Sequence, residues 1–160
     1  MTGNLIDILH RLSVHHVDFV IIGGFAAVTH GSTLVTQDID ICCEFSETNL
    51  KKLQKAIEDL HPVHRLTPKR IPLQITPEFC KGLNNLYLNT DIGILDCLSS
   101  VLGIGNFKKV RKCSVTIKGM NNQKFRVLSL DALIVAKKAM GRAKDKETVI
   151  QLQAILDKKS

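Results

Sequence analysis

The sequence predicts an α+β fold, in which helices pack on a mixed sheet that contains hairpins. Three observations support this: short apolar segments with alternating polar residues, longer segments with helical periodicity, and neighbouring strand candidates separated only by short turns. The chain has 160 residues, of which 44% are hydrophobic and 23% charged, and this length and composition suit one globular domain with its own core. We therefore expect a single domain over residues 1–160, with residues 129–160 as a basic, helical C-terminal part.

The first third of the chain alternates between helix and strand candidates. Residues 4–15 carry apolar side chains at helical spacing, and Asn4 is a candidate N-cap. An apolar strand over 17–22 ends at Gly23-Gly24, and a short helix over 25–30 follows. Residues 37–43 form a second strand candidate, and residues 46–60 an amphipathic helix.

The rest of the chain is expected to be richer in hairpins. All four prolines lie within residues 62–77, a segment that favours extended or turn conformations, with short strands at 63–66 and 73–75. Residues 85–98 and 113–128 each read as a hairpin. Ser129 is a candidate N-cap for a helix that Gly141 would end, and a last helix is expected over 145–156.

Charge is distributed unevenly along the chain. The formal charge is −3 over residues 1–106 and +10 over residues 107–160. The basic part is consistent with contacts to phosphates of a nucleotide or of RNA, and the alternative is a solvated helical surface. Aromatic residues make up only 4%, with no Trp, which argues against base stacking on an aromatic platform.

The cysteines and the hydropathy indicate a cytoplasmic protein. The five cysteines form no C-x-x-C pair and match no zinc-site spacing, so reduced, buried thiols are expected. No apolar segment approaches the roughly 20 residues of a membrane span, and no signal peptide is recognisable.

Two aspartates are the strongest functional signal. Asp38 and Asp40 alternate with isoleucines in a strand candidate, so both carboxylates project from one face. Such a pair predicts a divalent-cation site, for which Asp96, flanked by apolar residues, is the best third ligand. Asp91 is the rival, but it lies in an expected turn. Three carboxylates can hold two ions, Mg²⁺ or Mn²⁺.

The glycine pair upstream suggests what the cation serves. Gly23 and Gly24 end a strand and open a helix, where backbone N–H groups can approach a phosphate closely. Alone this signal is weak, because many strand–helix turns contain glycine. Its closeness to the aspartates strengthens it.

Together these motifs resemble the polymerase-β-like nucleotidyltransferase superfamily. The matching residues are Ile22-Gly23-Gly24, Asp38-Ile-Asp40 and Asp96, with further matches at 24–31, 95–103 and 130–145, so that the resemblance covers roughly residues 15–157. Within the superfamily the chain is similar to small bacterial minimal-type enzymes, which are related to toxins of abortive-infection and toxin–antitoxin systems.

The resemblance implies a nucleotidyltransferase fold and a role for each matching residue. Its metal ligands would be Asp38, Asp40 and Asp96, and its nucleotide-binding residues Gly23, Gly24, Lys137, Arg142 and Lys144. The implied reaction is transfer of a nucleoside monophosphate from an NTP to an acceptor hydroxyl of an RNA such as tRNA, of a protein side chain or of a small molecule. The basic C-terminal part favours RNA.

Two further implications concern the biological role and its alternative. The protein could be a toxin that a partner antitoxin neutralises. Relatives commonly carry Arg at the position of Leu34, so the alternative is a nucleotide- or RNA-binding module of the same fold with weak or no catalysis.

Overall fold

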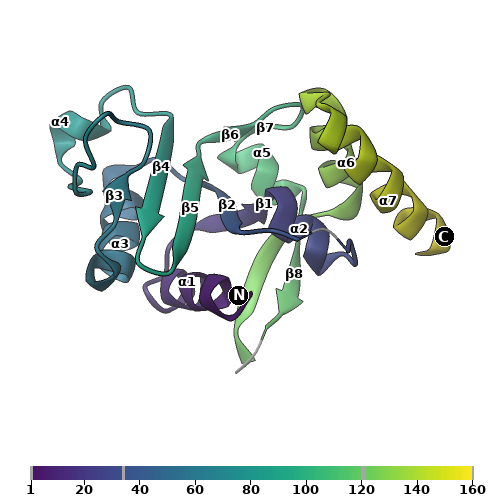
Figure 1. Ribbon diagram of the computed structural model, residues 1–160, viewed down its shortest axis with the longest axis horizontal. Coiled ribbons are helices and arrows are strands. Elements are labelled where there is room, and N and C mark those ends of the chain that lie inside the picture. The colour runs from purple at the N-terminus through teal and green to yellow at the C-terminus, as the bar shows by residue number, and fades with distance from the viewer. Residues whose placement is uncertain (1, 34, 120–121, 160) are drawn as a thin grey trace.

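The computed structural model describes residues 2–33, 35–119 and 122–159, and a seven-stranded mixed sheet organises them (Figure 1). The strand order is β3-β4-β5-β2-β1-β9-β8. The strands are β1 Phe19–Ile22, β2 Asp38–Cys43, β3 Val63–His64, β4 Asn85–Thr90, β5 Gly93–Leu98, β8 Ser114–Lys118 and β9 Lys124–Leu128, and a separate pair joins β6 Ser100–Val101 with β7 Gly105–Asn106.

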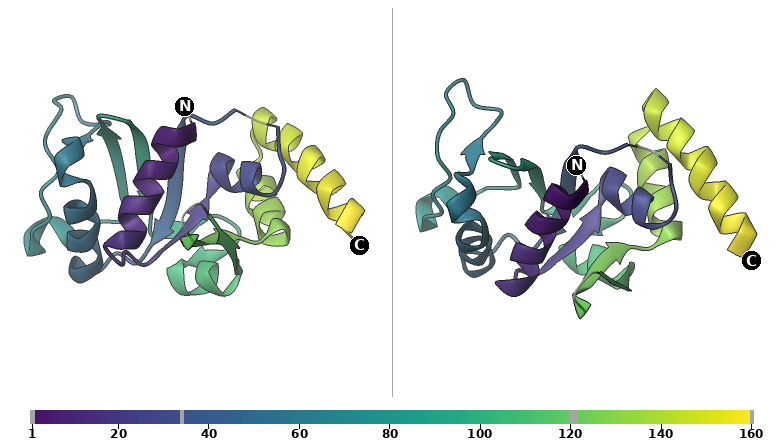
Figure 2. Two further views of the ribbon diagram at one scale, coloured as in Figure 1. Left: turned by 90° about the horizontal axis from the view of Figure 1, so that it is seen from below. Right: turned by 60° about the horizontal axis from the view of Figure 1, so that its bottom comes forward.

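Helices surround this sheet. They are α1 Thr2–Val14, α2 Gly23–Thr29, α3 Glu47–Ile57, the 3-10 turn η1 Glu58–Leu60, α4 Pro77–Cys80, α5 Phe107–Lys112, α6 Leu130–Met140 and α7 Ala143–Lys159. Helices α1 and α3 pack against each other, as do α6 and α7. In every view α6 and α7 form one end of the molecule, and α3 and α4 lie toward the other (Figures 1 and 2). The predicted α+β class with a C-terminal helical segment is confirmed.

Strand pairing in the middle of the sheet brings distant segments together. Strand β2 runs antiparallel to β1, with Ile22 opposite Asp40, and parallel to β5, with Asp40 opposite Asp96. Strand β9 is parallel to β1. Parallel neighbours need a crossover connection, and the chain between β2 and β5 supplies it with α3, β3, α4 and β4.

Alternation along β2 separates the core from the site. Ile39 and Ile41 are fully buried, whereas Asp38 and Asp40 are half-buried on the other face. The core beneath joins the apolar face of α1 and α3 to the central strands. The same strand therefore contributes to hydrophobic stability and presents two carboxylates at the surface of a cleft.

Several sequence-based boundaries need correction. Asn4 lies inside α1 and is not its N-cap, because the helix already begins at Thr2. Residues 73–75 form no named strand; the proline-rich segment instead adds one isolated bridge, Val63 to Pro72. Both predicted hairpins are present, as β4–β5 and β8–β9. The connection 99–112, for which no elements were predicted, contains β6, β7 and α5.

The C-terminal helices follow the predicted capping signals. The Ser129 hydroxyl accepts a hydrogen bond from the Ala132 N–H at 3.2 Å, and Gly141 ends α6 with a φ of 68°. The next helix begins at Ala143, so Lys137 and Lys144 lie on successive helices. Across the described ranges, no helix has the combination of length and apolar character that crossing a bilayer requires.

Candidate active site

The turn from β1 into α2 makes room for Asp40. Gly23 has a φ of +71°, and a Cβ on it would lie 2.3 Å from Oδ2 of Asp40. A side chain at position 23 would therefore collide with the carboxylate, in addition to straining the backbone. Gly24 lies beside Thr36, and a Cβ on Gly24 would lie 3.2 Å from Oγ1 of Thr36. The glycine pair thus allows close approach of the β1–α2 backbone to the aspartates of β2.

The structure brings the three predicted carboxylates to one place. Asp38 and Asp40 share a face of β2, and Asp96 lies opposite Asp40 on the parallel strand β5. We call these three residues the carboxylate cluster. Burial, and then the like charges of Asp96 and Asp38, raise the pKa of Asp40 from 3.8 to about 6. Burial is thus the main reason that the Asp40 carboxyl holds its proton more tightly, and the neighbouring acids add to the effect.

An arginine that the sequence analysis did not single out contacts this cluster. Arg65 follows β3, and its Nε donates to Oδ1 of Asp96 at 3.0 Å while its Nη2 donates to Oδ2. The guanidinium also lies 5.4 Å from the centre of the Tyr87 ring. The hydrogen bonds to Asp96 raise the pKa of Arg65. No local motif marks this arginine, because strand pairing alone brings it to the site.

Cations line the other side of the site, and a buried aspartate arranges two of them. Asp145 is 1% exposed and accepts hydrogen bonds from Nε of Arg142 at 2.6 Å and from Nη2 at 3.1 Å. Nζ of Lys137 lies 3.7 Å from the same carboxylate. Hydrogen bonding to Arg142 lowers the pKa of Asp145, and burial lowers that of Lys137. In the sequence, Asp145 is marked only as the last residue of the matching segment 130–145; in the structure it contacts both cations.

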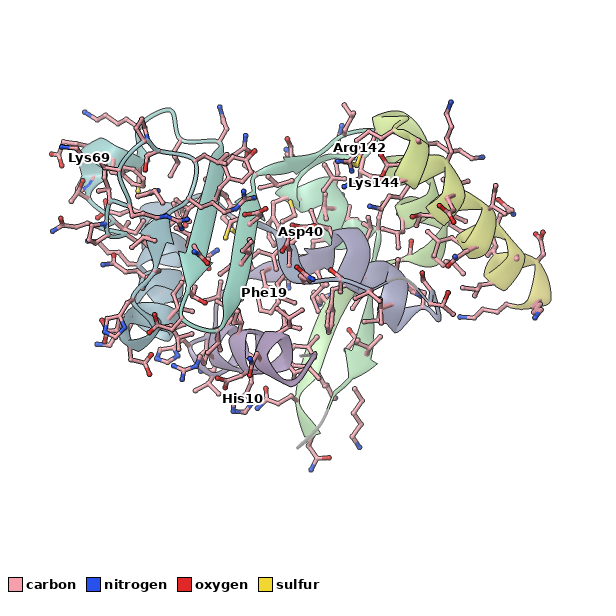
Figure 3. All side chains as sticks on the ribbon, in the orientation of Figure 1. His10, Phe19, Asp40, Lys69, Arg142 and Lys144 are labelled. Carbon is pink, nitrogen blue, oxygen red and sulfur yellow. The ribbon has the colours of Figure 1, made fainter. Side chains whose placement is uncertain are left out.

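A cleft of about 630 Å³ separates the acidic and basic sides. Figure 3 shows Asp40 near the centre of the molecule, and Arg142 and Lys144 above it at the start of α7. The carboxylate cluster thus faces a basic wall across a space open to solvent, an arrangement suited to a polyphosphate and its counter-ions. The cleft is lined by Gly24, Val35, Thr36, Gln37, Asp38, Asp40, Tyr87, Asp96, Leu98, Lys137, Met140, Arg142, Lys144, Asp145, Glu147 and Thr148.

The donors of the cluster suit a hard divalent cation. They are carboxylate oxygens, the ligand type that Mg²⁺ and Mn²⁺ prefer. Burial is the main cause of the raised pKa of Asp40, and the like charges of Asp96 and Asp38, which a cation would offset, come second. In the part of the chain that the structure describes, no three acidic, His or Cys side chains stand arranged to hold a metal ion as they are, and Asp96 is bound to Arg65.

Other candidates lie elsewhere. Asp91, the rival third ligand, is in the β4–β5 turn and pairs with Nδ1 of His61 at 2.7 Å. Leu34 lies outside the described residues. Much of the positive charge of the C-terminal part is on α5 and the β8–β9 hairpin. Some of these cations line a groove that includes Phe19, the first residue of β1. Ile22 and its partner Asp40 lie at the other end of β1.

Solved structures with the same fold include nucleotidyltransferases. The lincosamide antibiotic adenylyltransferase LnuA, with lincomycin bound, superposes with a TM-score of 0.62 at 17% identity, over 97% of this chain and 98% of that one. The antibiotic-resistance factor ANT(2'')-Ia gives 0.61 at 15% identity, over 96% and 83%. A candidate nucleotidyltransferase from Thermotoga maritima gives 0.57 at 18%, over 94% and 90%.

These likenesses extend over nearly the whole chain and show that it has the nucleotidyltransferase fold. Neither the protein-family models nor the sequences of curated proteins give a match. The fold is therefore established by three-dimensional similarity, while the activity has to be argued from the site itself.

Proposed function

We propose that the protein transfers a nucleoside monophosphate from an NTP to an acceptor hydroxyl. The observation that carries this proposal is the pairing of Asp40 with Asp96 across β2 and β5, opposite a wall that contains Lys137 and Arg142. A cluster of acids facing a cluster of bases, with room for a ligand between them, matches the needs of nucleotidyl transfer. That reaction depends mainly on positioning and on neutralising phosphate charge.

Each side of the cleft has its own task in this proposal. The carboxylate cluster would hold divalent cations, Mg²⁺ or Mn²⁺, which when bound neutralise phosphate charge and make the acceptor hydroxyl more acidic. Lys137, Arg142 and Lys144 bind the triphosphate, and Asp145 keeps the first two in place. The glycine turn lets the backbone of Gly24 approach the phosphates.

A hollow beside the cleft indicates which class of compound would serve as the acceptor. A second hollow of about 500 Å³ lies next to the cleft, and Tyr87 and Leu98 line both of them. We call it the uncharged hollow, because its lining contains no Asp, Glu, Lys, Arg or His: Asn85, Tyr87, Leu98, Ser100, Val101, Leu102, Gly103, Ile104 and Gly105. Its chemistry favours a small, uncharged hydroxyl compound as the acceptor.

RNA remains a second candidate acceptor, and the basic surface favours it. Residues 107–130 contain seven Lys and Arg and no Asp or Glu. Three of them, Arg111, Lys124 and Arg126, line a groove of about 430 Å³. Lys52 of α3 and Asp18, which pairs with Arg111 at 3.3 Å, also line it. An RNA acceptor would have to reach from this groove to the cleft. The toxin role and the antitoxin partner stay predictions from the sequence resemblance.

The test is incorporation of each labelled NTP, with Mg²⁺ or Mn²⁺, into total tRNA and into pools of small hydroxyl compounds. We expect Asp40→Asn to abolish transfer, since it removes a charge from the cluster. Asp91→Asn is the matched control, because that aspartate lies in a turn outside the cleft and its loss should leave transfer intact. Unchanged transfer by Asp40→Asn would contradict the proposal.

The alternative is a binding module that keeps the fold without turnover, and the same samples distinguish it. Calorimetry with each NTP measures binding, and a pyrophosphate-release assay measures turnover. Binding without pyrophosphate release across both acceptor pools would favour the module.

A further inference from the structure

Arg65 lies beside Asp96, at the place where the proposed reaction would put a divalent cation. Its guanidinium binds both oxygens of Asp96, the residue that faces Asp40 in the register of β2 and β5. The pair is sheltered, with the Arg65 side chain 25% exposed and the Asp96 side chain 12% exposed. Two-point contacts of this kind are strong and directional, so the pair is a defined component of the site.

None of the described cations that line the cleft forms an ion pair with the carboxylate cluster. Arg142 is bound to Asp145 at 2.6 Å, and Lys137 lies 3.7 Å from the same carboxylate. Lys137 is on α6 and Arg142 lies between α6 and α7, whereas Asp96 is on β5. Among the described residues, Arg65 is thus the cation bound directly to the carboxylate cluster, although it does not itself line the cleft.

We infer that Arg65 is the resident counter-ion of the carboxylate cluster, and that a divalent cation binds there by displacing its guanidinium from Asp96. This inference rests on the proposed function, since it concerns the same site. Three acids cannot share a sheltered face without positive charge, and one carboxylate cannot give both oxygens to a guanidinium and also ligate a metal ion freely. Arg65 is therefore a positioning residue that sets metal affinity.

The backbone around Arg65 lets the side chain move alone. The Arg65 N–H donates to the Tyr87 carbonyl at 3.1 Å, and the His64 N–H donates to the Ile71 carbonyl at 2.9 Å. The first bond holds the main chain beside β4, and the second ties it to the segment before Pro72. A released guanidinium consequently stays near the Tyr87 ring, at the border between the cleft and the uncharged hollow, where it faces the acceptor side.

The direct test is Mn²⁺ affinity of the metal-stripped full chain, measured by electron paramagnetic resonance without NTP or acceptor. Arg65→Gln should bind Mn²⁺ about ten-fold more tightly than wild type, because the competing cation is gone, a change equivalent to about 1.4 kcal/mol. Arg70→Gln is the matched control: it removes the same charge from an exposed site in the same segment. It should change the affinity little, since solvent and salt screen exposed charges.

Further variants assign the effect to the ion pair. Adding Asp96→Asn to Arg65→Gln should abolish the gain. Arg65→Lys keeps the charge but loses the two-point contact, so it should fall between wild type and Arg65→Gln; it also replaces Arg65→Gln in the comparison if circular dichroism shows that variant to be unfolded. An Mn²⁺ affinity of Arg65→Gln, or of Arg65→Lys in that event, no higher than that of Arg70→Gln overturns the inference.

Failure of the inference can be told apart from failure of the proposed function. Nucleotide transfer with equal Mn²⁺ affinities in all variants would leave the function standing and remove the role of Arg65. Tighter Mn²⁺ binding by Arg65→Gln in a protein that transfers no nucleotide would retain the counter-ion role and remove the function.

Discussion

Asp40 offers a thermodynamic test of the site that does not depend on finding a substrate. The carboxylate is half-buried next to two other acids, and its pKa in the folded protein is raised to about 6. Replacing it with Asn keeps the shape and removes the charge. We predict that Asp40→Asn is more stable than wild type above neutral pH when a chelator removes divalent ions.

The size of the effect follows from linkage. The unfolded chain releases the Asp40 proton near the ordinary value of 3.8, whereas the folded chain holds it up to about 6, so wild-type stability falls as pH rises across this interval. About two pK units correspond to about 3 kcal/mol. Because Asp40 borders an open cleft, solvent screening reduces this to about 1–2 kcal/mol.

The measurement is urea or thermal unfolding of wild type and Asp40→Asn from about pH 4 to about pH 8. The two proteins should differ least near pH 4, where the unfolded chain has released the Asp40 proton only in part, and should diverge as pH rises to about 6. At the high end the melting temperature of the variant should be about 2–8 °C higher. A gain that is absent, or constant over the whole pH range, would refute the electrostatic reasoning.

Asp145→Asn supplies the opposite case. Hydrogen bonds from Arg142 lower the pKa of Asp145, so its ionised form stabilises the folded state above the ordinary pKa, and this contribution is lost as pH falls through the lowered value. The variant should be less stable than wild type near neutral pH and approach it in acid. If Asp40→Asn and Asp145→Asn changed the stability in the same direction near neutral pH, neighbouring charges would not determine either effect.

Two further substitutions test the backbone of the site. Gly23→Ala and Gly82→Ala both place a side chain at a φ of +71°, but only the Cβ at position 23 would come within 4 Å of other atoms, at 2.3 Å from Asp40. Thermal unfolding should show Gly23→Ala to be about 1–3 kcal/mol less stable than Gly82→Ala. Equal losses of stability would exclude the collision as the cause. Ser129→Ala removes the N-cap of α6 and should cost about 1 kcal/mol in urea unfolding, with the transfer rate unchanged; a rate that falls with stability unaffected would assign the serine to the cleft instead.

Local patterns in the sequence were sufficient for most of the elements and for half of the site. The alternation of acids and isoleucines in 38–41 predicted a strand with two carboxylates on one face, which is how β2 lies. Capping residues predicted both ends of α6, because Ser129 and Gly141 act through their own neighbours. Signals of this kind need only a few adjacent residues.

The parts that were missed depend on contacts between distant segments. Arg65 lies in a proline-rich segment without helical or strand periodicity, and only the pairing of β4 with β3 and β5 brings it to Asp96. The parallel partners β2 and β5 were not predicted, since parallel pairing leaves no turn signal between the strands. The contact of Asp145 with Lys137 likewise requires the packing of α7 on α6, whereas its contact with Arg142 is local.

The parallel register of β2 and β5 also has a consequence for how the protein folds. Asp40 and Asp96 come from segments separated by a whole crossover, so their contact has a high sequence separation and forms only when the central sheet closes. A ligand that bridges these two strands would bind the fully folded state alone. It should therefore slow hydrogen exchange throughout β1, β2 and β5 together, in place of protecting a single loop.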